Sequence, residues 1–358
     1  MSPTIKDIAL RSGFSTPTVS CVLNDKAHLF KPETREKIIA AARELGYTPN
    51  VAARALRGQR TRTVGYIGNA YYVDAFVDTN GSLVMEGSDR RLNELGYRML
   101  TSFCRRQENR FLESVGSYRA QRVEGLLLYA VQFWGRWATP ESVREALPAE
   151  IPTVTIQNIG PMCEATFPAE IRTDSSTGFS QLLDHAFKLG HRRFALVTSS
   201  LSSNRQKLAS LEQAIARSGL SDVLVRAVEK ISSYHKAVDC VDEILAMNPR
   251  PTFVLCFSDL LAMGVIRGLS KRGLRVPEDI SVSGYDNNPQ VEMSDVPLTT
   301  VEQPFLELGR QAVDLLLELI EEEANVPVDE RQARRRKVSR EVPTSLVVRE
   351  STGPVKNK

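Results

Sequence analysis

The sequence predicts a small all-α head followed by a larger α/β body made of two lobes. In the first 48 residues, apolar side chains recur at helical spacing in three short runs. From Thr63 onward, short β-rich runs alternate with helical stretches, which is typical of parallel strands joined by crossover helices. Charge divides the chain in the same way, because residues 1–62 carry eleven Lys or Arg against five Asp or Glu, whereas the whole chain has a net charge of only +3. A basic head on a near-neutral body favours a polyanionic partner for the head alone.

The composition excludes several classes of protein. A length of 358 residues with 42% hydrophobic and 25% charged residues is that of a globular chain with two or three domains. No run approaches the ~18 apolar residues of a membrane span, and the N-terminus has no signal-peptide core. We therefore expect a cytoplasmic protein without membrane contact. The cysteines are too far apart for a disulfide framework or a zinc site, which indicates a reducing compartment; they are Cys21, Cys104, Cys163, Cys240 and Cys256.

The head begins with two short helices joined by a tight turn. Thr4 is placed to cap the first helix, and Gly13 ends it. Ser15 is placed to cap the second helix, where Pro17 is tolerated because N–H groups of the first turn have no intrahelical acceptor. Two helices and a glycine turn make a helix-turn-helix unit. Its apolar inner faces consist of Ile5, Ile8, Ala9, Val19, Val22 and Leu23.

Two further segments complete the head. A third helix is expected from Pro32 to Gly46, with Ile38, Ile39, Ala42 and Leu45 facing inward. Residues 49–58 form a fourth segment of about two turns, which is marginal alone and can fold on binding DNA. Leu56 has little core available there and can wedge between base steps in a minor groove.

Short polar side chains cover the outer side of the second helix. Hydroxyl and amide groups of this kind reach phosphate oxygens and fix a helix in a major groove. The alternative is that these serines and threonines only cap helices, and it stays open for Ser15. The set comprises Thr16, Pro17, Thr18, Ser20 and Cys21, flanked by Asn24 and His28.

The body repeats a strand–helix pattern in two lobes. Helices are expected over 82–95, 176–189, 205–218, 235–247 and 259–272. Ligands of open α/β sheets bind beyond the carboxyl ends of the strands, here between the lobes. The predicted strands are TVGYIG, YRMLTSF, EGLLLYAV and IPTVTIQ in the first lobe and RRFALVTS, VLVRAVE, TFVLCFS and ISVSGYD in the second.

Motifs along nearly the whole chain resemble the LacI/GalR family of bacterial transcription regulators. The densest part combines TIKDIALRSGFSTPTVSCVLN, PETREKIIAAARELGYTPNVAARALRG and RTVGYIG. Weaker motifs follow: RVEGLLL, LGHRRFALV, CFSDLLAMG, GLRVPEDISVSGYDN, PLTTVEQP and TSLVVRES.

The resemblance implies an N-terminal helix-turn-helix head with a hinge helix, followed by a two-lobed α/β body like periplasmic binding proteins. The DNA-binding domain would span 1–48, the hinge helix and linker 49–62, the effector-binding and dimerisation domain 63–351, and a tail 352–358. Within the body, lobe 1 would take about 63–158 and 298–325, and lobe 2 about 159–297 and 326–351.

For the head, the resemblance implies specific DNA contacts. Thr16, Pro17 and Cys21 match the base-reading positions of the recognition helix. Leu56 matches the hinge leucine inserted at the centre of the operator, on the same hinge as Arg54. Cys21 departs from the family, which most often has Arg there, and a thiol cannot make arginine's bidentate contact with guanine. The remaining DNA-binding candidates, mostly at phosphate-holding positions, are Thr4, Ser15, Thr18, Ser20, Asn24, His28 and Asn50.

For the body, the resemblance implies an effector site around Asp286 and Arg205. Asp286 ends the strand ISVSGYD, so its carboxylate would face the cleft, and Arg205 is similar in place to an arginine that grips the effector. Such a pair can bracket a polyol or a sugar acid with charge-assisted bonds. The alternative is a lobe-spanning salt bridge or a helix cap. Asp259 is expected to be the N-cap of its helix. Further candidate lining residues are Ser258, Tyr129, Gln157, Phe76, Ser232 or Ser233, whereas Trp134 and Trp137 are expected in packing roles.

Signatures of catalysis and of metal binding are missing from the sequence. It has no G-x-G-x-x-G after a first strand, no G-x-x-x-x-G-K-[ST], no G-x-S-x-G and no H-E-x-x-H, and its four histidines lack metal-ligand spacing. We therefore expect no enzyme, no cofactor and no metal. His191, in the turn LGHRR, is expected to have a structural hydrogen bond.

These features predict a ligand-responsive transcription regulator, most simply a repressor. A homodimer would bind a near-palindromic operator, and a small-molecule effector, a sugar or sugar acid or else a purine nucleobase, would control its affinity. The alternative is a sugar-binding protein, transport receptor or enzyme with a fused basic module. A ligand-independent architectural DNA protein is a third class, but it would leave the two-lobed body without a purpose.

Overall fold

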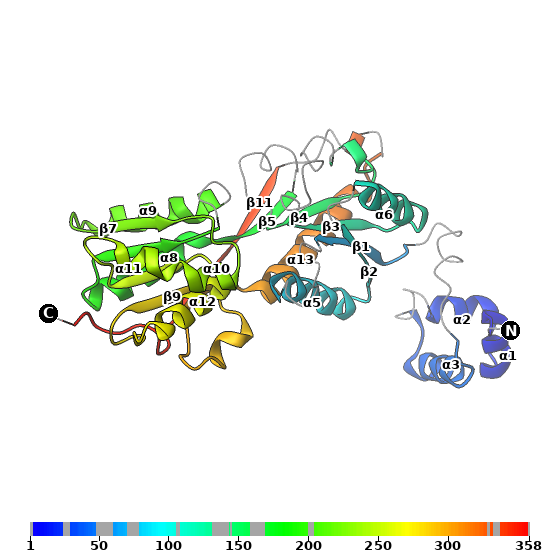
Figure 1. Cartoon of the computed structure of the whole chain (residues 1–358). Coiled ribbons are helices and arrows are strands. Elements are labelled where there is room, and N and C mark those ends of the chain that lie inside the picture. Colours follow the sequence, from blue (N-terminus) through cyan, green and yellow to red (C-terminus); the bar gives the residue numbers. More distant parts are fainter. Residues whose placement is uncertain are drawn as a thin grey trace. The chain divides into compact units, whose positions relative to one another are not determined.

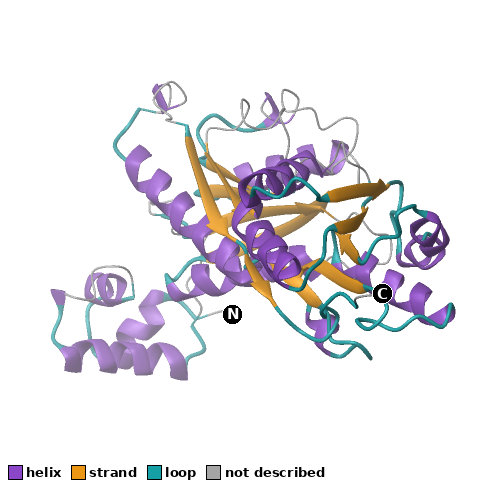
Figure 2. Ribbon diagram, turned by 90° about the vertical axis from the view of Figure 1, so that its left-hand side faces the viewer, coloured by secondary structure: helices purple, strands orange, loops and turns teal. Residues whose placement is uncertain are grey.

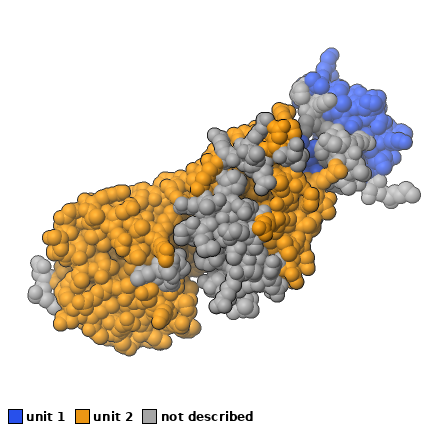
Figure 3. Space-filling view, turned by 90° about the horizontal axis from the view of Figure 1, so that it is seen from above, with its two compact units in different colours: residues 1–61 blue, residues 62–358 orange. Residues whose placement is uncertain are grey.

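A computed structural model of the chain shows two compact units, residues 1–61 and 62–358, which are described separately (Figures 1 and 3). The structure describes residues 3–23, 29–47, 60–69, 79–104, 108–130, 143, 145–157, 169–199, 204–327, 330–331 and 337–356. None of the helices in these ranges is long and apolar enough to cross a membrane.

The head contains the predicted helix-turn-helix and third helix: α1 (Ile5–Ser12), α2 (Thr16–Val22) and α3 (Pro32–Glu44). At the start of α1, the Asp7 carboxylate accepts hydrogen bonds from the backbone N–H and the hydroxyl of Thr4, both at 2.7 Å. Gly13 ends α1 in the left-handed region, at φ +76°, where a side chain would be strained. The three helices close one small core around the fully buried side chains of Ile8, Val19 and Ile38.

One predicted core position of α3 is wrong. Ile39 was expected to face inward, but it is 39% exposed. Ile38, Ala41 and Ala42 define the buried face, because residues three and four apart share one side of a helix. Ile39 follows Ile38 by one residue, so it is turned by about 100° away from that face.

Each lobe of the body contains a six-stranded sheet. The first sheet has the order β11-β5-β4-β3-β1-β2 and the second β12-β10-β9-β8-β6-β7. Neighbouring strands are parallel, except that β10 and β12 are antiparallel. The strands of the first sheet are β1 (Thr63–Asn69), β2 (Arg98–Cys104), β3 (Gly125–Tyr129), β4 (Thr153–Ile156), β5 (Ala169–Asp174) and β11 (Val338–Pro343). Those of the second are β6 (Arg193–Val197), β7 (Leu224–Val228), β8 (Phe253–Cys256), β9 (Ser281–Asp286), β10 (Thr299–Glu302) and β12 (Ser345–Val347). All eight predicted strands are confirmed.

Helices pack on both sheets, as Figure 2 shows. Packing against the first sheet are α5 (Thr79–Glu94), α6 (Glu108–Ala120) and α13 (Phe305–Glu323). With the second sheet lie α8 (Ser175–Lys188), α9 (Arg205–Ser218), α10 (Tyr234–Asp239), α11 (Val241–Ala246) and α12 (Asp259–Lys271), followed by the 3-10 turn η4 (Pro289–Glu292). The single helix expected over 235–247 is therefore two short helices that meet at Cys240.

The chain crosses between the lobes at points that differ from the expected boundaries. Residues 159–174 were assigned to the second lobe, but β5 pairs with β4 in the first sheet. Residues 326–343 were assigned there too, but β11 pairs with β5. Conversely, β10 lies beside β9 in the second sheet, so the first lobe resumes only with α13. The three crossings therefore follow Asp174, Glu302 and Pro343.

The first lobe is braced by close packing of α5 on α13. Gly87 and Gly309 lie where the helix backbones meet. A Cβ atom at Gly87 would overlap the Leu306 carbonyl oxygen, and one at Gly309 would overlap the Val84 carbonyl oxygen. The Ser88 hydroxyl also contacts the Gly309 carbonyl oxygen at 3.3 Å.

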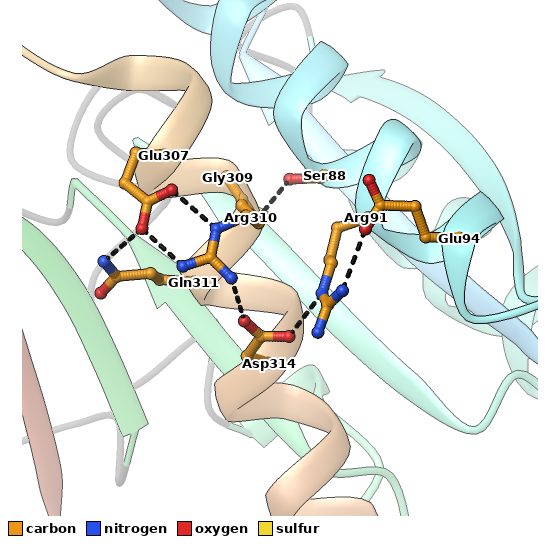
Figure 4. A network of polar contacts seen from close by, with 8 residues as sticks. All are labelled: Ser88, Arg91, Glu94, Glu307, Gly309, Arg310, Gln311 and Asp314. Atoms are coloured by element: carbon orange, nitrogen blue, oxygen red, sulfur yellow. Dashed lines mark hydrogen bonds and ion pairs between the residues drawn. The ribbon is translucent and has the colours of Figure 1, made fainter.

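A polar network runs along the outside of this helix pair (Figure 4). Arg91 of α5 donates through Nε to Asp314 of α13 at 2.7 Å. Arg310 donates to the other Asp314 oxygen at 2.8 Å and to both carboxylate oxygens of Glu307 at 2.6 Å. These contacts join the two helices and hold Arg310 in one orientation.

His191 has the expected structural role. Its Nδ1 lies 3.0 Å from the Thr252 hydroxyl, and its Nε2 lies 2.9 Å from the Gly353 carbonyl oxygen. The ring is buried, and burial lowers its pKa. The histidine thus links the end of the chain to the second sheet.

Candidate functional site

The outer side of α2 is the candidate DNA-reading surface of the head. Val19 and Val22 turn into the core, whereas Thr16 and Pro17 are exposed and Thr18, Ser20 and Cys21 are half-buried. A helix that buries one side and leaves short polar groups on the other can enter a major groove without breaking its own core.

Some of the DNA-binding candidates, among them Ser15, Thr18 and Thr4, also have local structural contacts. The Ser15 hydroxyl oxygen accepts from the Thr18 backbone N–H at 3.3 Å, so Ser15 caps α2 as its alternative role required. The Thr4 hydroxyl donates to Asp7. Asn24, His28, Asn50, Arg54 and Leu56 lie outside the described residues, as do Phe76, Trp134 and Trp137 of the body.

The candidate effector site lies at the carboxyl ends of the strands. Residues that end or directly follow β3, β4 and β9 have positive φ: Ala130 at +53°, Gln157 at +52° and Asp286 at +121°. Such a backbone costs free energy for most residues other than glycine, and residues held in this way tend to cluster at functional sites. Tyr129 is the buried last residue of β3.

Asp286 lies within a buried chain of hydrogen bonds. Its Oδ1 accepts from Gln303 Nε2 at 2.6 Å. Gln303 Oε1 accepts from Thr173 Oγ1 at 2.6 Å and from Gln157 Nε2 at 2.9 Å. The structure thus brings together two predicted site residues, Asp286 and Gln157, through Gln303 and Thr173, which sequence reasoning missed.

Lys207 is a cation that lies beside Tyr285, the neighbour of Asp286 in β9. Its Nζ lies 3.7 Å from the centroid of the Tyr285 ring and donates to the Phe257 carbonyl oxygen at 3.0 Å. Burial lowers the pKa of Lys207, and the negative charges of Asp286 and Asp259 oppose that fall.

Arg205, the cation expected from the sequence, is the exposed first residue of α9. Its contact with an effector stays a prediction. Lys207 could have been found from its spacing, because it precedes the buried residues Ser210, Leu211 and Ala214 by three, four and seven positions. A lysine on the buried face of a helix indicates a partner in the protein or in a ligand.

Asp259 is the first residue of α12, and not its N-cap as the sequence predicts. The N-cap of α12 is Ser258, whose hydroxyl oxygen accepts from the Leu261 backbone N–H at 3.4 Å. Asp259 is the buried first residue of the helix, and its carboxylate accepts from the Thr300 hydroxyl at 2.5 Å and from the Asn288 backbone N–H at 2.7 Å. Burial raises the pKa of Asp259 to about 7, and the charge of Asp286 adds to the rise.

Ser232 and Ser233 make hydrogen bonds to Lys236 at the start of α10. The Ser233 hydroxyl oxygen caps the helix by accepting from the Lys236 backbone N–H at 3.3 Å. The Ser232 hydroxyl oxygen accepts from Lys236 Nζ at 3.4 Å. Their role as lining residues stays a prediction.

Two family models match the chain. The model described as bacterial regulatory proteins of the lacI family matches residues 4–50, and the one described as a periplasmic binding protein-like domain matches residues 183–352. The HTH-type transcriptional repressor PurR of Vibrio atlanticus (strain LGP32) is 31% identical over 323 residues, covering 89% of this chain and 92% of that protein. The PurR repressor of Haemophilus influenzae (strain PittEE) is 28% identical over 323 residues, covering 88% and 91%.

Solved structures share the architecture of the whole chain. The lac repressor dimer bound to operator and the anti-inducer ONPF has a TM-score of 0.73 and 28% identity, covering 99% of this chain and 100% of that one. The complex of the transcriptional regulator CelR with cellobiose has a TM-score of 0.65 and 27% identity, covering 98% and 99%. The helical head and the two-sheet body therefore occur together in these proteins.

Proposed function

Because the chain belongs to the LacI family of bacterial regulatory proteins and is a DNA-binding transcriptional repressor with a ligand-binding body, we propose that a small effector held between its lobes sets its affinity for an operator. The observation that carries the proposal is the buried chain of hydrogen bonds from Asp286 through Gln303 to Gln157 at the carboxyl ends of the strands, with Lys207 on the ring of Tyr285. A helix-turn-helix head needs no such buried charged site for DNA binding alone.

The head of each protomer would read one half of a near-palindromic operator in the bacterial cytoplasm. In a homodimer, two recognition helices lie in successive major grooves, with Thr16, Pro17 and Cys21 at the bases. Because a thiol lacks arginine's two parallel donors, we expect a weaker preference for guanine opposite Cys21. Leu56 would wedge between base steps at the centre of the site.

The effector that this site favours is a sugar acid or a sugar. The Asp286 carboxylate suits hydroxyl groups, and the ammonium of Lys207 suits an acidic group. A purine nucleobase is the second candidate, because the two relatives described above are PurR repressors and purine nucleobases are among the effectors that the family resemblance implies.

Operator binding in the presence of candidate effectors tests the proposal. Fluorescence anisotropy with DNA from the chain's own upstream region would be measured with sugars, sugar acids and nucleobases in turn. We expect specific binding whose affinity changes with at least one compound. Thr16→Ala should weaken it, whereas Ala40→Ser, on the exposed side of α3, should not. If the wild-type protein bound no fragment at low salt, with or without the compounds, the repressor assignment would be wrong. Sugar binding without DNA binding would support the alternative of a sugar-binding protein.

A further inference from the structure

The side chain of Gln303 joins the candidate effector site to the first lobe. Gln303 follows strand β10 of the second sheet and precedes α13, which packs on the first sheet. Its amide contacts Asp286 at the end of β9 on one side and Thr173 and Gln157 of the first lobe on the other. One side chain at a chain crossing therefore connects both sheets.

The two ends of this hydrogen-bonded chain fix its direction. The Asp286 carboxylate can only accept, so Gln303 must present its NH₂ group there and its carbonyl oxygen to the first lobe. At the other end, the Thr173 backbone N–H can only donate, and Gln157 Oε1 accepts it at 3.0 Å. Gln157 must then present its own NH₂ group to Gln303 Oε1. Neither amide can turn around without losing bonds at both of its ends.

Burial makes the chain sensitive to the loss of any member. Thr173 is 2% exposed, Gln157 5% and Gln303 8%, so solvent does not replace a lost partner. Asp286 is 7% exposed and is the member that carries a charge. A new partner at the Asp286 carboxylate therefore affects the hydrogen bonds that Gln303 makes to Thr173 and Gln157 in the first lobe.

We infer that Gln303 is a positioning residue that makes the first lobe respond to the occupancy of Asp286. A hydroxyl or N–H group of an effector that donates to Asp286 competes with Gln303 Nε2 for the same oxygen. When Gln303 moves, its contacts to Thr173 and Gln157 change, and the carboxyl ends of β4 and β5 shift with them. The hydrogen bonds of this linkage are present in the structure, whereas their use in regulation rests on the function proposed above.

Hydrogen–deuterium exchange of the full-length protein tests the linkage without any effector. The readout is a peptide that contains the Thr173 amide, measured by mass spectrometry. Asp286→Ala, a change in the second lobe, should speed exchange of that peptide by about tenfold, because Gln303 loses its charged acceptor. Asp286→Asn keeps an acceptor oxygen and should restore slow exchange. Ser283→Ala on the same strand is the matched control and should leave it unchanged, and peptides from α5 and α13 report any global unfolding.

Gln303→Leu tests the same linkage from its centre. It should speed exchange at Thr173 as Asp286→Ala does. In anisotropy with the upstream operator, it should also reduce by about tenfold the affinity change that D-glucuronate or hypoxanthine produces. Unchanged exchange in both Asp286→Ala and Gln303→Leu overturns the linkage, and unchanged coupling in Gln303→Leu overturns its regulatory use. Failure of the proposed function is distinct, because then the wild-type protein would show no operator binding or no response.

Discussion

Asp259 is a carboxyl group whose surroundings favour its neutral form. It is buried at the start of α12, and burial with the nearby charge of Asp286 raises its pKa to about 7. An unfolded chain ionises the same group near its ordinary pKa, so the folded protein binds the proton more tightly. This group therefore contributes stability below about pH 4, and the contribution is lost as the pH rises through 7.

Asp259→Asn should remove this pH dependence. The amide can accept from the Asn288 N–H with its oxygen and donate to the Thr300 hydroxyl, so both contacts survive. Between pH 4 and 7, the wild-type free energy of unfolding should fall by on the order of 1–4 kcal/mol relative to the variant. Calorimetric melting across that range measures it, with Asp239→Asn, an exposed site, as control. Parallel curves for wild type and Asp259→Asn would show that the carboxyl is ionised throughout.

Lys207 should set the preference between acidic and neutral effectors. Lys207→Met keeps the length of the side chain and removes the charge, so we expect D-glucuronate to bind about tenfold more weakly or worse. Binding of D-glucose should change little. Isothermal titration gives both constants, and Lys271→Met, an exposed lysine of α12, is the control. Equal loss for the two sugars would mean that Lys207 acts by packing on Tyr285 rather than by its charge.

The sequence predicts the site residue at the end of a strand, Asp286, but not the lysine near the start of a helix, Lys207. Asp286 is the last residue of the predicted strand ISVSGYD, so the sequence alone locates it at the carboxyl edge. Arg205 and Lys207 are two residues apart and therefore about 200° apart around α9. An error of two residues in the register of the helix thus exchanges an exposed cation for a half-buried one. Gln303 lies in the motif PLTTVEQP, but the motif assigns it no role. Only the folding of β10 beside β9 brings it to Asp286.

At the scale of elements, α5 and α13 form the tightest helix pair of the first lobe. Gly87 and Gly309 allow the two backbones to approach, and Arg91, Arg310 and Asp314 join the helices alongside. Sequence patterns predict a helix over 82–95, which corresponds to α5, but do not predict α13. They also do not predict this approach, because a glycine within a helix only lowers its propensity. The physical reason for these glycines appears once the two helices are side by side.

Gly309→Ala should destabilise the body through this contact. Its methyl group would overlap the Val84 carbonyl oxygen, a backbone atom that cannot move alone, so a loss of about 1–3 kcal/mol in the free energy of unfolding is expected. Gly116→Ala in α6 is the matched control, because nothing lies within 4 Å of its new methyl group. That variant should be neutral or more stable by about 0.5–1 kcal/mol. Urea denaturation compares them, and equal stabilities would show that the helices can separate at little cost.

The central strands were predicted, but β5 and β11, at one side of the first sheet, were not, for a physical reason. The strands β3 and β4 are buried throughout, so they read as apolar runs. The strands β5 and β11 carry charges that they satisfy between themselves: Ser339 donates to Glu170 at 2.7 Å, and Arg172 pairs with Glu341 at 2.8 Å. In the sequence, charged residues within such short segments are more typical of a loop than of a buried strand. The error in the lobe boundaries follows from missing this pair of strands.

At the scale of the whole molecule, the operator and the effector must influence each other equally. If an effector changes operator affinity by some factor, the operator changes effector affinity by the same factor. Titration of whichever panel compound shifts operator binding, into the free protein and into the protein–operator complex, measures both constants. The direction of the shift will also show whether the compound releases the repressor or retains it on DNA. Unequal factors would mean that a third equilibrium, such as dimer dissociation, takes part.

Three separate stretches of backbone pass from one lobe to the other, after Asp174, Glu302 and Pro343. A protease that cuts any one of them leaves two covalent ties, so a singly nicked molecule should keep both halves together. The same three connections oppose free rotation of one lobe about the other, so small bending or shearing displacements are the movements that the proposed regulation can use.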